Sequence, residues 1–199
     1  MFNIRKAAST DIGAAVAVLG DAFARDPLMM HVFQDNPGGV RAGVMRFFSI
    51  LLRVRIALDM PAFVLEEGGE VRGAAMGYDT SRPAWPAALT AEMHALETDV
   101  PGFAARMADY EKICDAHQPG AAHYYLGVIG VQPSLQGKGA GKALLEAFCA
   151  PSGADATSHG VYLDTSNTKS LDFYYRNGFE LMGEGVLGDV RIWCVFRRT

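Results

Sequence analysis

Residues 131–145 read VQPSLQGKGAGKALL and decide the fold of this chain. The run from His123 to Val131 is rich in β-branched and aromatic residues and predicts a strand that leads into this stretch. A helix is predicted to follow it, from about Gly141 to Cys149. Between the two, glycines allow positive φ angles and bring unpaired N–H groups to one point at the helix N-terminus. That point attracts anions, so the stretch predicts a phosphate or pyrophosphate site.

Two common phosphate-binding loops do not fit this stretch. A Walker loop that ends at Gly141-Lys142 requires glycine at position 136 and Ser or Thr at position 143, where the chain has Gln136 and Ala143. A dinucleotide-binding fingerprint that begins at Gly137 requires its last glycine at position 142, where Lys142 stands. A glycine-rich turn that only joins a strand to a helix remains the alternative for the stretch taken alone.

Two motifs, in this order along the chain, resemble those of the GNAT superfamily of N-acetyltransferases. Gln136, Gly139 and Gly141 match the Gln/Arg-x-x-Gly-x-Gly/Ala core of the family's acetyl-CoA signature. Downstream, YLDTSN at 162–167 and FYYRNGF at 173–179 look like the second cofactor motif, a strand followed by Asn and a Tyr-x-x-x-Gly-Phe helix end. These residues cover about a quarter of the chain strongly, and within the family they look most like the branch of puromycin N-acetyltransferase-like proteins.

The resemblance implies a mixed α/β (α+β) fold of the acyl-CoA N-acyltransferase type. Its centre would be a mostly antiparallel, splayed sheet of six to seven strands, flanked by helices. We expect a single domain over residues 1–199. Residues 1–120 would supply the acceptor-side helices and the first strands, and residues 121–199 the acetyl-CoA-binding half.

Hydrophobic periodicity and turn residues predict the other elements. Strands are expected at 2–6, 62–66, 71–78, 161–165 and 189–196. The first helix is expected to begin after N-cap residues at 9–11 and to end at about residue 23. Further helices are expected at 43–58, 87–98, 102–117 and 169–176. Asp26 and Pro27 interrupt the first helix. In the helix at 43–58, we expect the arginines at 46, 53 and 55 to keep their charged ends in water.

The resemblance also implies which residues hold acetyl-CoA. The strand near residue 129 would diverge from the one near residue 161, and the pantetheine arm would pair with main chain in the gap, while the glycine loop would cradle the pyrophosphate. The implied set is Ile129, Gly130, Val131, Gln136, Gly137, Lys138, Gly139, Ala140, Gly141, Lys142, Asn167 and Tyr174. Asn167 could instead cap the helix that follows it.

Three side chains are candidates for catalysis. Tyr174 stands four residues before Gly178, where family members commonly carry the tyrosine that protonates the departing thiolate. Histidine ordinarily titrates near neutrality, so His123 could be the general base, and Asp164 could orient it or act through water. The alternatives are a core tyrosine, a hydrogen-bonded core histidine and an aspartate that binds a turn.

The acceptor is expected to be a small-molecule amine. Its site would use the first two helices and the loops after them, where methionines and aromatic residues accompany an acid and favour an apolar cation. The candidates are Phe23, Asp26, Met29, Met30, His31, Phe33 and Trp85. The same residues could be plain core. A domain that binds coenzyme A without transferring acetyl is the alternative function.

Composition narrows the classes of partner. With a net charge of −4 and a pI near 5.7, the chain has no general attraction for nucleic acid or an anionic membrane. The 3 cysteines lack CxxC spacing and the histidines lack metal-site spacing, so neither a disulfide framework nor a metal is expected. We see no export signal or membrane span, which favours a cytoplasmic protein. The resemblance allows a homodimer.

Overall fold

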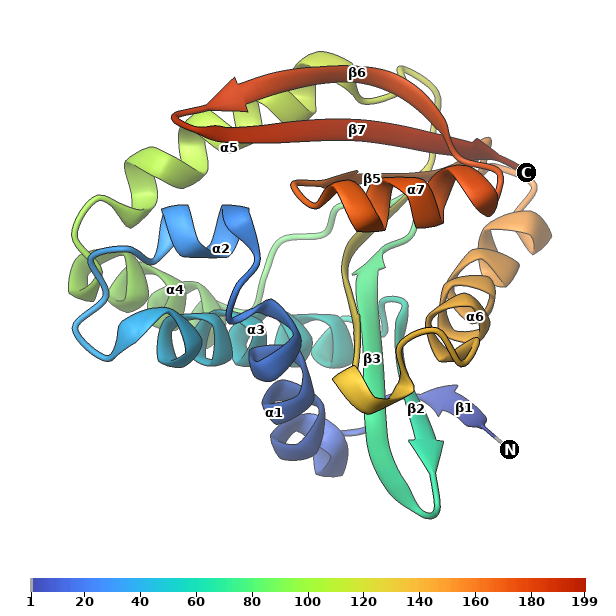
Figure 1. Ribbon diagram of the computed structural model, residues 1–199, viewed down its shortest axis with the longest axis horizontal. Coiled ribbons are helices and arrows are strands. Elements are labelled where there is room, and N and C mark those ends of the chain that lie inside the picture. Colours follow the sequence, from blue (N-terminus) through green and yellow to red (C-terminus); the bar gives the residue numbers. More distant parts are fainter. Residues whose placement is uncertain (1) are drawn as a thin grey trace.

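A seven-stranded sheet runs through the computed structural model, which describes residues 2–199 (Figure 1). The strands are β1 (Asn3–Lys6), β2 (Ala62–Glu67), β3 (Glu70–Tyr78), β4 (Tyr124–Val131), β5 (Gly160–Thr165), β6 (Glu180–Leu187) and β7 (Val190–Arg198). Their order is β1-β2-β3-β4-β5-β7-β6, and every neighbouring pair is antiparallel except β4 and β5. The predicted mixed α/β fold with a mostly antiparallel sheet is therefore confirmed.

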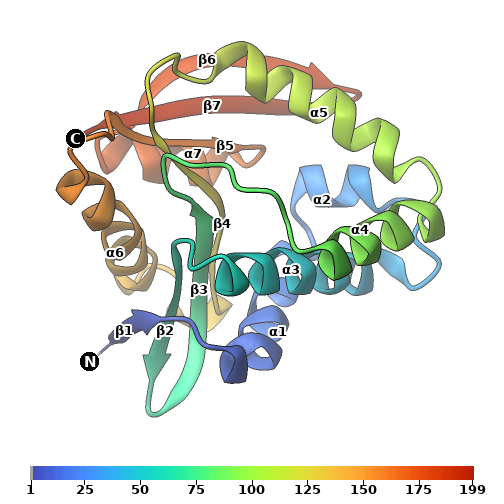
Figure 2. The ribbon, with the colours of Figure 1, turned by 180° about the vertical axis from the view of Figure 1, so that it is seen from behind.

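Helices cover both faces of this sheet. They are α1 (Ile12–Phe23), α2 (Pro27–Val32), α3 (Gly39–Ala57), α4 (Ala87–Asp99), α5 (Phe103–His117), α6 (Ala140–Ala154) and α7 (Thr168–Arg176). Both ribbon views place α6 on one side of β3, with α1 and α3 on the other (Figure 2). One core cluster joins α1, α3 and α5 to the sheet through residues such as Leu19, Phe48 and Phe103. A second cluster joins α6 and α7 to the opposite face through Phe148 and Leu171.

The two parallel strands part soon after they begin. The ladder between β4 and β5 contains the pairs Tyr124 with Val161 and Tyr125 with Tyr162, although both strands continue beyond them. Beyond these pairs, β4 keeps its ladder with β3. The sheet is therefore splayed, as predicted, and the edge of β4 that faces β5 is left without a ladder.

A β-bulge lies where the strands part. Met76 pairs with Val128 and Gly77 with Leu126, so Gly127 is an extra residue in β4. Gly77 admits no side chain, because a Cβ there would lie 1.9 Å from the carbonyl oxygen of Tyr125 and 2.6 Å from Cζ of Phe148. The glycine thus allows β3, β4 and α6 to approach closely at the level of the bulge.

Two elements were not predicted from the sequence. Asp26 and Pro27 do end α1, but they also begin α2, because the Asp26 side chain accepts a hydrogen bond from the N–H of Met29 at 3.1 Å and proline suits the first helical position. Strand β6 contains Gly183 and Gly185, which weaken a strand pattern. A Cβ at these glycines would lie 2.2 Å from His117 and 2.6 Å from Ile113, so close packing of α5 requires them.

Replacing Gly77 by alanine should destabilise the protein. We expect Gly77→Ala to lower the free energy of unfolding by about 1–3 kcal/mol, because the new methyl group meets backbone that cannot move independently. Gly13→Ala is the matched control: nothing lies within 4 Å of its Cβ, and alanine in a helix should stabilise by roughly 0.5–1 kcal/mol. Urea unfolding measures both, and equal stability of Gly77→Ala and wild type would contradict the prediction.

Candidate active site

The glycine loop before α6 presents unused backbone donors. Gly139 is the N-cap residue of α6 at φ +85°, and Gly137 has φ +75°. No neighbour lies within 4 Å of a Cβ at either position, so the left-handed backbone, rather than crowding, requires glycine here. No side chain caps α6.

Most amides from 137 to 142 have no acceptor in the described part of the chain. The N–H of Lys138 donates to the carbonyl of Leu135 at 3.2 Å, whereas no such bond is made by the amides of Gly137, Gly139 or the first three residues of α6. Lys138 and Lys142 are exposed beside them. Free donors, a helix N-terminus and two cations suit a diphosphate, so the loop fits the pyrophosphate of acetyl-CoA.

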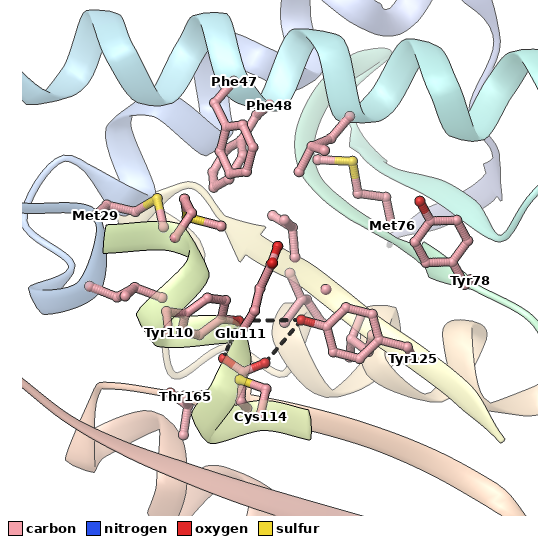
Figure 3. A pocket seen from close by; sticks show the side chains of 18 of the residues that line it. Met29, Phe47, Phe48, Met76, Tyr78, Tyr110, Glu111, Cys114, Tyr125 and Thr165 are labelled. Atoms are coloured by element: carbon pink, nitrogen blue, oxygen red, sulfur yellow. Dashed lines mark hydrogen bonds between the residues drawn. The ribbon is translucent and has the colours of Figure 1, made fainter. Parts of the chain in front are cut away.

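A cavity of about 540 Å³ opens where β4 and β5 part (Figure 3). Strand β4 lines it from Tyr125 to Ile129, the end of β5 lines it with Asp164 and Thr165, and α7 contributes Tyr174. Of the other predicted cofactor residues on β4, Gly130 lies against α1, where a Cβ would be 2.9 Å from Leu19. The predicted glycine loop does not line this cavity.

Tyr174 lies in the cavity with a free hydroxyl. The residue is 6% exposed, and its ring packs edge-on against Phe173 and Phe179 with centroids 5.4 and 5.5 Å away. No side-chain hydrogen bond is made by its hydroxyl to any described residue, and burial raises its pKa well above the ordinary tyrosine value. The group therefore keeps its proton at neutral pH and has that proton available.

Asp164 is held by two tyrosines. Tyr110 donates to its Oδ2 at 2.7 Å and Tyr125 to its Oδ1 at 3.0 Å, and the two hydroxyls are 3.4 Å apart (Figure 3). Burial raises the pKa of Asp164, while the two tyrosine hydrogen bonds oppose the rise. Asp164 is half-buried and lines the cavity.

His123 lies in the same cavity but not beside Asp164. Its Nδ1 lies 2.8 Å from the carbonyl oxygen of Ala121, a bond that requires a proton on Nδ1. Its Nε2 is buried without a partner, and burial lowers the pKa of the ring. In the neutral ring this Nε2 is a hydrogen-bond acceptor. No hydrogen bond joins His123 to Asp164 among the residues described.

Strand register separates His123 from the bulge. His123 comes directly before β4 and precedes Gly127 by four positions, about 13 Å of extended chain. Asp164 lies two positions beyond Tyr162, which pairs with Tyr125, so it stands at the level of Gly127. Of the two candidate bases, Asp164 is therefore the one at the level where the strands part.

Asn167 caps α7. Its Oδ1 accepts a hydrogen bond from the N–H of Lys169 at 3.0 Å, which is the alternative role considered from the sequence. Before it, Ser166 donates to Asp26 at 3.3 Å and accepts from the N–H of Leu28 at 3.2 Å. The end of β5 is thus tied to the start of α2, which brings the acceptor-side helices to the cavity.

The acceptor-side candidates divide into two groups. Phe23, Asp26, Met29 and Trp85 line the cavity. The other three do not: Phe33 is fully buried against Phe47 and Phe103, Met30 is 49% exposed, and His31 lies near Gly188. Burial raises the pKa of Asp26, with the nearby charge of Asp164 adding to the rise.

Sequence reasoning missed several residues of the cavity, among them Tyr110, Glu111 and Arg55, and misplaced Arg55. Tyr110 and Glu111 of α5 line it, and Figure 3 shows Glu111 reaching into it. Arg55 of α3 also lines it and is 4% exposed, so the expectation that its charged end stays in water is wrong. The reason was visible in the spacing, because Arg55 follows Phe48 and Leu52 on the apolar side of the helix.

Other kinds of site are not seen in residues 2–199. No group of three or more His, Cys, Asp or Glu side chains there could hold a metal ion. The cysteines, at 114, 149 and 194, are buried and free. None of the described helices has the length and apolar character that a membrane crossing requires.

Comparison with known proteins finds one family for this chain. A family model described as an acetyltransferase (GNAT) domain matches residues 60–181. The fold is similar to that of a histone acetyltransferase HPA2 and related acetyltransferase from Corynebacterium glutamicum, at 23% identity and TM-score 0.71, covering 98% of this chain and 95% of that one.

Two further structures share the fold. A polyamine N-acetyltransferase from Drosophila melanogaster, which forms N-acetylagmatine, is 17% identical with TM-score 0.66 and coverage of 98% of both chains. A ribosomal-protein-alanine N-acetyltransferase from Brucella melitensis is 18% identical with TM-score 0.61 and coverage of 99% of both chains.

The raised pKa of Asp164 makes stability depend on pH. Above about pH 4 the unfolded chain loses this proton while the folded protein keeps it, so stability falls as pH rises toward the folded pKa. Asp164→Asn removes this contribution. We expect its stability relative to wild type to increase with pH, by at most about 1.4 kcal/mol per pH unit.

Urea unfolding from about pH 4 to about pH 7 measures this difference. Asp172→Asn makes the same chemical change at an exposed position of α7 and is the control. Its free energy of unfolding should vary with pH as that of the wild type does. Parallel pH profiles of Asp164→Asn and wild type would show that the folded carboxyl group titrates at its ordinary value.

Proposed function

The chain belongs to the GNAT family and is an N-acetyltransferase, and from this premise we propose that it transfers acetyl from acetyl-CoA to the amine of a small molecule. One observation carries the proposal: β4 and β5 part over a cavity lined by the free hydroxyl of Tyr174 and the half-buried carboxyl group of Asp164, and β4 leads into a loop of free amides. The cavity volume, about 540 Å³, suits a small molecule.

The glycine loop and β4 would hold acetyl-CoA. The free amides of 137–142 would bind the pyrophosphate, with charge added by Lys138 and Lys142. The edge of β4 at Ile129–Val131 lacks a neighbouring ladder and would pair with the pantetheine arm as an added strand does. When bound, acetyl-CoA supplies an acetyl group activated as a thioester.

Backbone at the bulge would stabilise the negative charge that develops on the acetyl oxygen. Gly127 belongs to neither ladder of β4, because the pairs with β3 skip it and those with β5 end at Tyr125. Donors fixed before reaction and aimed at the oxyanion are effective in a site shielded from water. We assign this role to N–H groups between Gly127 and Ile129.

Tyr174 would be the general acid. Its raised pKa keeps the hydroxyl protonated, and the absence of an internal hydrogen bond leaves the proton free to pass to a thiolate. The aromatic packing of its ring against Phe173 and Phe179 would fix the direction of the hydroxyl. The core-filling role and the catalytic role use different atoms of this side chain.

Asp164 would receive the proton of the amine. An amine must lose a proton to attack a thioester, and a carboxyl group whose pKa lies above its ordinary value is a stronger base than an exposed aspartate. Each carboxylate oxygen has lone pairs beyond the one used by its tyrosine. The transfer would be direct or through a water bound to Tyr110 or Tyr125. His123, just before β4 and about 13 Å of extended chain from the bulge, would contact another part of the acceptor.

Acetyl-CoA binding tests the loop. At a concentration 100 times its Kd, acetyl-CoA should stabilise the wild type by about 2.7 kcal/mol. Gly139→Ala should weaken this stabilisation at the same ligand concentration, because alanine resists φ +85° and would move the amides. Gly153→Ala, in the same helix with nothing within 4 Å of its Cβ, should retain it. A thermal shift assay compares the three, and no shift of wild type at millimolar acetyl-CoA would reject the proposed cofactor.

Tyr174→Phe should separate binding from transfer. We expect release of coenzyme A in the presence of a working amine to slow by about 10²-fold or more, while acetyl-CoA binding stays nearly unchanged. Tyr175→Phe, at the 42% exposed neighbouring position, is the control. Unchanged turnover of Tyr174→Phe would remove it as the acid, and binding of acetyl-CoA without turnover on any amine would indicate a non-catalytic domain.

A further inference from the structure

Two buried side-chain atoms in residues 2–199 lack any hydrogen-bond partner, and both belong to residues that line the same cavity. They are Nε of Arg55 and Nε2 of His123. The two residues are 4% and 8% exposed. Native proteins rarely leave such atoms unpaired, and their gathering in one cavity indicates polar groups of a ligand.

Arg55 has no carboxylate partner in the described chain. Its Nη1 makes one long contact, 3.5 Å, with the carbonyl of Leu51, and no ion pair involves it. Arg53, two residues earlier on α3, forms an exposed bidentate pair with Glu92 at 2.5 and 2.8 Å. The buried arginine of this helix is thus the one left without an anion.

Aromatic stacking does not satisfy this guanidinium. Arg55 lies over the ring of Tyr78 at 4.0 Å and near that of Trp85 at 5.7 Å, which supports the charge. A cation–π contact supplies no in-plane acceptor, so Nε of Arg55 and the N–H fork to which it belongs remain without an anion. That fork matches the two oxygens of a carboxylate.

A second cation stands at the same end of the cavity. Arg82 also lies over the ring of Tyr78, at 5.0 Å from its centroid, and donates hydrogen bonds to the carbonyls of Asp79 and Ser81. Acidic groups such as Asp26 and Asp164 line the part of the cavity near α2 and the end of β5. The cavity therefore has a cationic region and an acidic region.

Strand register gives the separation of these regions. Tyr78 pairs with Tyr125, which precedes Gly127 by two positions, or about 7 Å of strand. Figure 3 shows Tyr78 and Tyr125 on the same side of the cavity, away from Met29. An anion at Arg55 would thus lie several bonds from an amine placed at the bulge. It would not be a cofactor phosphate, because the glycine loop does not line this cavity.

We propose that the acceptor carries a carboxylate, bound by Arg55, several bonds away from the amine that is acetylated. This inference rests on the proposed function and narrows it to amino acids with distant amine and carboxylate groups, or short peptides. A planar carboxylate suits one guanidinium between aromatic rings better than a dianionic phosphate does. Arg55 is then a specificity residue and takes no part in proton transfer.

Binding without turnover gives the first test. The probes are 6-acetamidohexanoate, which is a product of the expected type, and its neutral amide, titrated into the wild type by calorimetry. We expect the carboxylate to bind at least tenfold more tightly than the amide. Equal affinities, or no binding of the carboxylate, would overturn the proposal, while acetyl-CoA binding and coenzyme A release with simple amines still test the proposed function separately.

Variants identify the residue responsible. Arg55→Met should abolish the preference for the carboxylate, and Arg55→Lys should restore part of it. Arg53→Met, on the same helix but exposed and paired with Glu92, should keep it. Arg55→Met should also melt at the wild-type temperature or above, because it removes an unpaired buried charge. A lower melting temperature together with an unchanged preference would show that Arg55 has only a structural role.

Turnover gives the last comparison. A series of ω-amino acids of increasing length is tested beside amines of equal length without the carboxylate. In the wild type, kcat/KM should favour the acid of at least one pair by tenfold or more, and in Arg55→Met the two members should become equal through a change in KM. If no pair differs in the wild type, the proposal fails although the acetyltransferase activity stands.

Discussion

The early end of the β4–β5 ladder is the constraint on which the rest of this structure depends. Two parallel strands that are bonded at Tyr124 and Tyr125 and then separate leave main-chain donors and acceptors facing a gap. Buried backbone groups without partners cost free energy, so the gap persists only if other contacts hold the strands apart. The ladder with β5 ends just before the bulge at Gly127, where Gly77 lets β3 and α6 approach β4 closely.

The separation of β4 from β5 leaves one cavity that is lined by polar side chains from both halves of the chain. Tyr174 and Asp164 come from elements that follow β4 in the chain, whereas Asp26, Arg55 and the aromatic residues around them come from the first half. Neither half alone encloses the volume. The hydrogen bonds from Ser166 to Asp26 join the end of β5 to the start of α2, and so hold the two halves of the chain together beside the cavity.

The sequence predicted the features that depend on a few consecutive residues, and it missed those that depend on tertiary contacts. The glycine loop, its strand and its helix were foreseen because positive φ and an uncapped N-terminus are properties of a few consecutive residues. Strand β6 was missed because its glycines are required by α5, a contact that no local pattern records. Asp164 was named as a candidate, but its partners Tyr110 and Tyr125 lie 54 and 39 residues away, and only the fold brings them to it.

Arg55 shows why functional residues are the hardest to foresee. A helix pattern with Phe48 and Leu52 predicts an apolar residue at position 55, and an arginine there is naturally interpreted as reaching for water. Burying Arg55 without an anion lowers the stability of the folded protein, whereas the pair of Arg53 with Glu92 stays in contact with water and has little desolvation penalty. Arg55 violates the pattern of its own helix and gains only aromatic contacts and one long hydrogen bond from the folded chain, and a ligand anion in the cavity explains why an arginine stands there.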